Sequence, residues 1–166
     1  AVAYALPPAV FALGLPVRRH LLLWQSLTVQ YNFGGKWTAL FCTGHRTAVP
    51  PALSAEHLYR FANSPGYDGQ FYHFIAHHPW FATRFSPSVD DPRMRWRKIL
   101  IPALAYLMAA GRTEFIDRAY RFVQLAWIFA RAYWSARYCS LYGQTPAWGL
   151  CFAPFPAPLG LCARSL

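Results

Sequence analysis

Long apolar stretches, separated by polar and strongly basic segments, place the tightest constraint on how this chain can fold. Only 13% of its 166 residues are charged, roughly half the share that is typical of a soluble domain. Aromatic residues make up 18% of the chain, and aromatic side chains gather where helices meet the surface of a bilayer. The pattern predicts an all-α fold of polytopic transmembrane helices.

The apolar stretches divide a single membrane domain, residues 1–166, into crossings and one long loop. We expect a first crossing within 5–33, an outward loop over 34–98, crossings at 96–111 and 115–139, and a fourth, proline-rich crossing at 147–162. Inside the loop, residues 69–78 have apolar side chains at helical spacing before Pro79. These residues predict a short helix at the membrane interface.

The charge is strongly positive, with a formal net value of +10. The basic residues flank apolar stretches instead of lining one polar face, so they favour a lipid bilayer and lipid-bound phosphate over nucleic acid as partners. Arg112, Arg118 and Arg121 surround the short connector before 115–139, and the positive-inside rule places that connector in the cytoplasm. We therefore expect a multi-pass protein of the inner (plasma) membrane with loop 34–98 facing outward.

Asp68 is the most suggestive of the chain's six acidic residues. It precedes Gly69 at the start of the predicted short helix, and glycine lets a backbone approach a ligand closely. An acid in this position can cap the helix, or it can act at the membrane surface as a general base or a metal ligand.

His73 and His77 are four residues apart, so a helix places them on one face, the spacing of a metal-binding pair. Asp68, Glu56 or His57 can supply a third ligand. Because none of these stands at a defined distance from the pair, we assign no metal ligands from the sequence. The alternative is a pair of interfacial histidines on the polar side of the helix.

A second group of charges follows, with Asp90, Asp91 and Pro92 in front of four basic residues, Arg93, Arg95, Arg97 and Lys98. The acids can cap the helix that follows while the bases lie among lipid head groups. Alternatively, the arginines hold a phosphate through paired donors.

The segments Gly-Tyr-Asp-Gly-Gln-Phe-Tyr-His at 66–73, Asp-Pro-Arg at 91–93 and Arg-Lys-Ile-Leu-Ile-Pro-Ala-Leu-Ala at 97–105 resemble a group of bacterial multi-spanning membrane proteins. That group is similar to the GT-C glycosyltransferases, which use polyprenyl-phosphate sugars. The resemblance covers about residues 31–150. It implies that Asp68 is the catalytic acid of the first outward loop and activates the acceptor, with a divalent metal in some enzymes. It also implies more crossings than this chain has, so the chain is identified as an N-terminal fragment.

The leading hypothesis is therefore sugar transfer from a lipid-linked donor on the outward face, with Asp68 as the catalytic residue. Substrate binding is assigned to the residues around it and to the arginine group: Tyr67, Gln70, Tyr72, His73, Arg93, Arg95 and Arg97. Two rivals remain open, a non-catalytic integral membrane subunit or fragment and a membrane metalloenzyme that uses His73 and His77.

Overall fold

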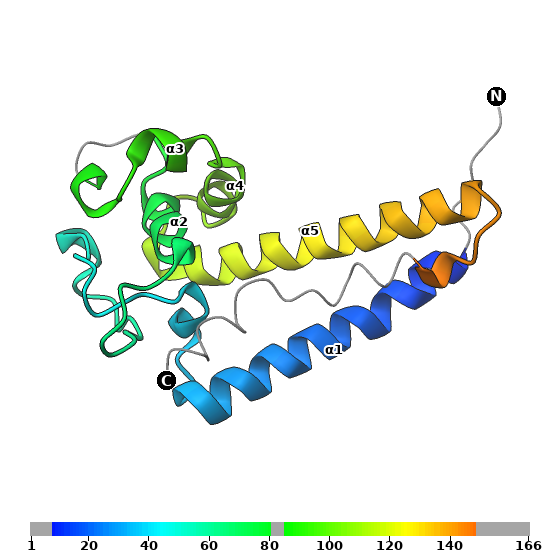
Figure 1. Cartoon of the computed structure of the whole chain (residues 1–166), viewed down its shortest axis with the longest axis horizontal. Helices are drawn as coiled ribbons and strands as arrows, with labels where there is room; N and C mark the ends of the chain where they lie inside the picture. Colours follow the sequence, from blue (N-terminus) through cyan, green and yellow to red (C-terminus); the bar gives the residue numbers. More distant parts are fainter. Residues whose placement is uncertain (1–7, 81–84, 149–166) are drawn as a thin grey trace. The chain divides into compact units, whose positions relative to one another are not determined.

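The computed structural model describes residues 8–80 and 85–148. The described part is all-α, and its α-helices are α1 (Pro8–Phe33), α2 (Asp68–His77), α3 (Pro92–Trp96), α4 (Leu100–Met108) and α5 (Thr113–Leu141) (Figure 1). Three short 3-10 helices lie between them, η1 (Trp37–Phe41), η2 (Pro51–Leu53) and η3 (Ser86–Ser88). The predicted all-α class is confirmed. Of the predicted fourth crossing at 147–162, residues 149–162 lie outside the described residues.

No helix in the described part is both long enough and apolar enough to cross a membrane. The predicted crossing at 96–111 contains only the nine residues of α4, about 13 Å of helix against a hydrocarbon core of about 30 Å. α1 and α5 have 26 and 29 residues, but α1 carries Arg18 and Arg19 near its middle and α5 carries charged residues along its length. The three crossings are therefore not found among the described helices.

The described residues separate into two compact units, one made of 8–27 and 125–148 and the other of 28–124. The second unit contains η1, α2, α3 and α4 and the beginning of α5. Within it α2 packs against α4, η1 and α3.

α2 begins and ends where its sequence predicts, within one residue at each end. Tyr67, in an extended conformation, precedes it, and His78 ends it directly before Pro79. Phe74 and Ile75 are fully buried, and the buried residues extend around the helix to Gln70 and His77. Neighbouring elements therefore cover α2 on several sides, and its position at a membrane interface stays a prediction.

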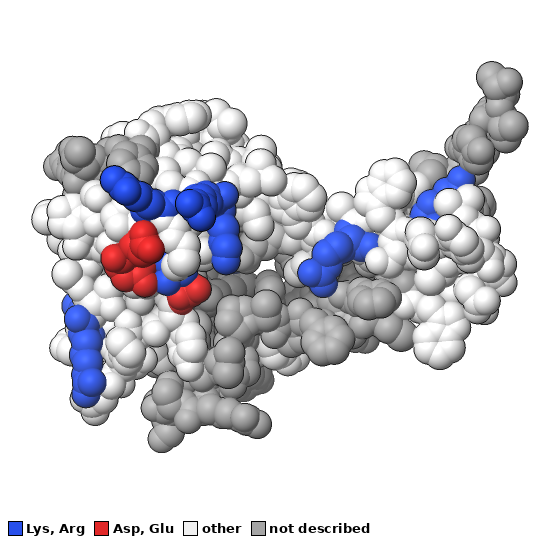
Figure 2. Space-filling model, turned by 45° about the horizontal axis from the view of Figure 1, so that its top comes forward, with Lys and Arg blue, Asp and Glu red and all other residues white. Residues whose placement is uncertain are grey.

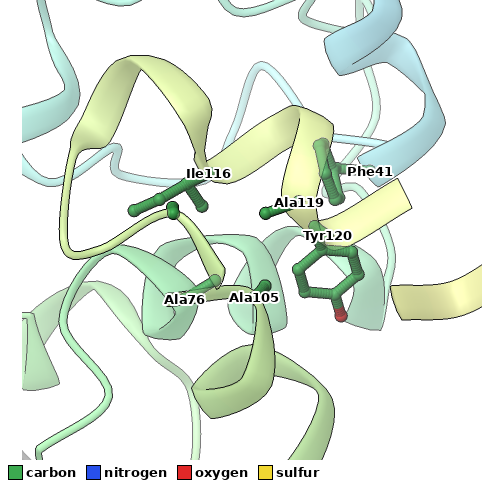
Figure 3. Packing of buried hydrophobic residues seen from close by; sticks show 7 residues of the cluster. Phe41, Ala76, Ala105, Ile116, Ala119 and Tyr120 are labelled. Atoms are coloured by element: carbon green, nitrogen blue, oxygen red, sulfur yellow. The ribbon is translucent and has the colours of Figure 1, made fainter. Parts of the chain in front are cut away.

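A core of small and aromatic residues fixes α2 against α4 and α5. Ala76 of α2, Ala105 of α4 and Ala119 of α5 let the helices approach closely, and Ile116 fills the space beside them (Figure 3). Phe41 from η1 meets Tyr120 of α5 edge to face, with ring centroids 5.2 Å apart. This packing positions the inward side of α2 against the first turns of α5.

The chain closes a long loop between η1 and α2 at a crossing of two backbone segments. The amide of Phe61 donates to the carbonyl of Thr43 at 2.9 Å, and the amide of Tyr67 donates to that of Cys42 at 3.1 Å. Gly44 and Gly66 meet here, and a Cβ on Gly44 would come within 2.2 Å of the Gly66 nitrogen. The crossing therefore fixes where the loop begins and where α2 starts.

Candidate metal centre

Two histidines lie side by side on the buried face of α2. His73 is fully buried and His77 is 6% exposed, and their Nε2 atoms are 3.2 Å apart. The His73 ring stacks on Phe41 of η1 with centroids 4.0 Å apart, which fixes its orientation. Two nitrogens bound to one tetrahedral zinc ion at about 2.05 Å each would lie roughly 3.3 Å apart, so the observed spacing suits a shared ion.

Glu56 joins this pair from the loop that the backbone crossing closes. It follows η2, where its amide donates to the carbonyl of Leu53 at 3.1 Å, and its Oε1 lies 3.4 Å from His77 Nδ1. One ligand atom from each of Glu56, His73 and His77 lies within 4.8 Å of the others, so the three residues can hold a metal ion. Of the three candidates for a third ligand, Glu56 is the one that the structure brings to the histidine pair, although the sequence alone assigned no metal ligands.

The same residues hold most of the buried side-chain atoms that lack a hydrogen-bond partner in the described structure. Glu56 Oε2, His73 Nδ1 and His77 Nδ1 are three of the four such atoms, and the fourth is Thr43 Oγ1. A buried polar atom without a partner costs about 1–3 kcal/mol, and native proteins keep few of them. All three of these atoms belong to the residues that can hold a metal ion.

Asp117, near the start of α5, also contacts His73. Its Oδ1 is 2.7 Å from His73 Nε2, and its side chain is 29% exposed. In many metal sites a carboxylate orients the imidazole through the ring nitrogen that does not bind the metal, whereas Asp117 contacts the same Nε2 atom that faces His77. Sequence analysis did not single out this contact, which joins residues 44 positions apart.

The acid–base properties of the group reflect burial and mutual charge. Burial raises the pKa of Glu56 to about 7, while the charge of His73 lowers it and that of Asp117 raises it. Burial and the charge of His73 lower the pKa of His77 to about 3 against the opposing effect of Asp117. His77 is therefore neutral at physiological pH, the form that binds metals.

The pKa of Asp117 shifts downward, in contrast to that of Glu56. Burial raises the pKa of its carboxyl group, but the hydrogen bond with His73 and the charges of His73, His77 and Arg121 together leave it below its ordinary value. Asp117 therefore carries a negative charge at physiological pH.

Asp68 does not belong to this group. It is the first residue of α2, after the N-cap residue Tyr67, so the interpretation of Asp68 as the cap is wrong. Its carboxylate, 66% exposed, lies 2.7 Å from Nη1 of Arg95. Asp90 accepts from Nε and Nη2 of the same arginine at 2.9 and 2.7 Å, and this bond lowers the pKa of Asp90.

Arg95 is thus a buried link between α3 and the start of α2. Its side chain is 6% exposed, and its guanidinium lies 5.0 Å from the centre of the Phe71 ring and 5.7 Å from that of Tyr72. Figure 2 shows acidic side chains directly beside basic ones on the face that it draws. The predicted cap of the following helix is confirmed, because Asp91 accepts from the amide of Met94 at 3.1 Å.

The remaining residues that the sequence assigned to a substrate are dispersed. Gln70 is buried and bridges the backbone crossing, accepting from the amide of Gly44 at 3.0 Å and donating to the carbonyl of Pro65 at 2.9 Å. Arg93 and Arg97 are exposed on and after α3. Of the residues assigned to substrate binding, only His73 belongs to the metal group, by which we mean Glu56, His73 and His77.

Comparison with known protein families, with curated proteins and with solved structures finds no match to this chain.

Proposed function

We propose that the protein binds one divalent transition-metal ion through Glu56, His73 and His77. The observation that supports this most is the meeting of three ligand atoms within 4.8 Å at a point where each residue also has a buried atom without a partner. Two imidazoles and one carboxylate suit zinc and iron(II) among biological metals, and zinc is the first candidate.

Three protein ligands leave a coordination position open, where an ion polarises an oxygen atom of water or of a substrate. The site is not closed off completely, because the side chains of Glu56 and Asp117 are 25% and 29% exposed. Asp117 lies 2.7 Å from His73 Nε2 and adds a second carboxylate to the site. This arrangement favours a reactive site over a closed structural one.

Metal content of the purified full chain tests the proposal. We expect one zinc per chain, measured by mass spectrometry after dialysis against zinc and then metal-free buffer. His73→Ala and His77→Ala should each remove it, since each deletes one of three ligands. His57→Ala is the matched control, because His57 adjoins Glu56 but is exposed. Equal zinc in all four proteins, or none in the parent, would refute the site.

Sugar transfer from a polyprenyl-phosphate donor is a second proposal, with Asp68 as base. It is supported by the sequence resemblance at residues 66–73 and by the exposure of the Asp68 carboxylate, 66%. Asp68→Asn should abolish transfer in an assay with a lipid-phosphate sugar, because the amide cannot take up the acceptor's proton. Full activity in that variant would favour the rival, a non-catalytic subunit.

A lipid bilayer is the partner we propose for the exposed side of α5. Trp134, Tyr138 and Leu141, at i, i+4 and i+7 on this helix, are each more than 60% exposed, and Trp and Tyr favour the bilayer interface. The inner membrane, with loop 34–98 outward, is the expected location. Extraction with carbonate at high pH is the test, and full release of the protein would count against an integral protein.

A further inference from the structure

Arg121 lies one turn after Asp117 on α5, beside the metal group. Its guanidinium lies over Trp37 of η1, 4.1 Å from the ring centre, and its Nε donates to the carbonyl of Asp117 at 3.4 Å. The side chain is partly buried, and burial lowers its pKa against the opposing charge of Asp117.

Among the described residues, no carboxylate lies within ion-pair distance of Arg121. Arg95, in contrast, pairs with two carboxylates and Arg112 with Glu114. A partly desolvated guanidinium that is held by an aromatic ring and a carbonyl keeps most of its five donors for another ligand.

The charges of the loaded site favour an anion. The ligand Glu56 and the neighbouring Asp117 contribute −2, the two metal-bound imidazoles are neutral, and a divalent ion contributes +2, so these groups sum to zero. Arg121 then leaves the site with a net charge of +1. An oxyanion that binds the ion through one oxygen can accept hydrogen bonds from the guanidinium through others.

We propose that the metal ion and Arg121 together bind a phosphoryl group, as free phosphate or as the phosphate of a lipid head group. This inference rests on the proposed metal site and adds its ligand class. The guanidinium matches the geometry of two phosphate oxygens, and the open coordination position accepts a third.

Cobalt(II) in place of zinc makes the site visible, because its absorption bands change when a ligand joins the metal. Inorganic phosphate is titrated into the cobalt-loaded full chain, and we expect a saturable spectral change. Arg121→Met should keep the cobalt affinity but weaken phosphate roughly 10- to 100-fold, the loss expected when a pair of charge-assisted hydrogen bonds is removed. Arg118→Met is the control, because Arg118 is exposed and contacts Phe115 instead.

The outcomes separate the two proposals. Failure of the parent protein to bind cobalt overturns the metal site and this inference together, whereas cobalt binding with the same phosphate affinity in Arg121→Met overturns this inference alone. If Arg121→Met does not fold, Arg121→Lys carries the test, with a smaller loss expected and an unchanged affinity contradicting the proposal. Hexyl phosphate is titrated in the same way as a second probe. Tighter binding of hexyl phosphate than of inorganic phosphate indicates a lipid head group, and equal binding indicates free phosphate; both results support the proposal. If neither compound binds, the proposal is refuted.

Discussion

Replacing Arg95 with methionine removes the charge that joins α3 to the start of α2 while keeping much of the side chain's apolar volume. Two carboxylates lose their partner. Asp90 loses a bidentate contact at 2.9 and 2.7 Å, and Asp68 loses one at 2.7 Å.

The expected loss follows from the exposure of these groups. Breaking a fully buried ion pair costs about 3–5 kcal/mol, but the side chains of Asp68 and Asp90 are 66% and 48% exposed and can return to water, so each contact is worth about 1 kcal/mol or less. The guanidinium also lies 5.0 Å from the Phe71 ring centre, a contact worth about 0.5–1 kcal/mol. We therefore expect Arg95→Met to lower the free energy of unfolding by about 1–3 kcal/mol.

Urea unfolding, followed by circular dichroism, measures this change, with Arg97→Met as the control because Arg97 is exposed nearby. Combining Arg95→Met with Asp90→Asn or Asp68→Asn forms two double-mutant cycles, and the bidentate pair should give the larger coupling energy. If Arg95→Met is as stable as Arg97→Met, the reasoning that this ion-pair group holds α3 to α2 is wrong.

Further predictions concern the metal and two backbone features. Zinc at about 100 times its Kd should stabilise the chain by about 2.7 kcal/mol, seen as a rise in Tm that excess chelator reverses. Zinc affinity should fall as the pH drops below about 7, because the ion must displace a proton from Glu56, whose pKa burial raises to about 7. A competition titration at several pH values checks this, and an equally steep fall of zinc affinity with pH in Glu56→Gln would contradict it. Gly66→Ala should lower the unfolding midpoint far more than Gly143→Ala, since both have positive φ but only the first places a Cβ within 2.5 Å of backbone. Asp91→Ala should cost about 0.5–2 kcal/mol and Asp91→Asn much less, because the asparagine still caps the amide of Met94; equal melting curves for the two variants would exclude the cap.

Local patterns in the sequence predicted local structure well. The spacing of Phe71, Phe74 and Ile75 and the position of Pro79 placed α2 to within one residue, and Asp91 before Pro92 placed the cap of α3. Each of these signals acts over one or two helical turns, so it can be interpreted from neighbouring residues without knowledge of the tertiary fold.

The metal group depends on contacts that no local pattern contains. The His73–His77 spacing indicated a pair of ligands, but the choice of Glu56 over His57 and Asp68 depends on how the loop closes. Asp117 reaches His73 because the start of α5 and α2 share one core cluster, which includes Ala76 and Ala119. Hydrophobic composition likewise predicted one crossing at 96–111, but it did not show that α3 ends at Trp96 and that α4 begins as a separate helix at Leu100.

The crossing at Gly44 and Gly66 lies between the two parts of the chain that supply the proposed metal ligands. Glu56 belongs to a loop whose two ends are held together by backbone hydrogen bonds and by Gln70, while the histidines belong to the helix that starts at the crossing. Substitutions inside the loop can therefore add or remove the third ligand while the ends of the loop stay in place. Related chains that differ in metal preference should accordingly vary around position 56 and keep glycine at both positions of the crossing.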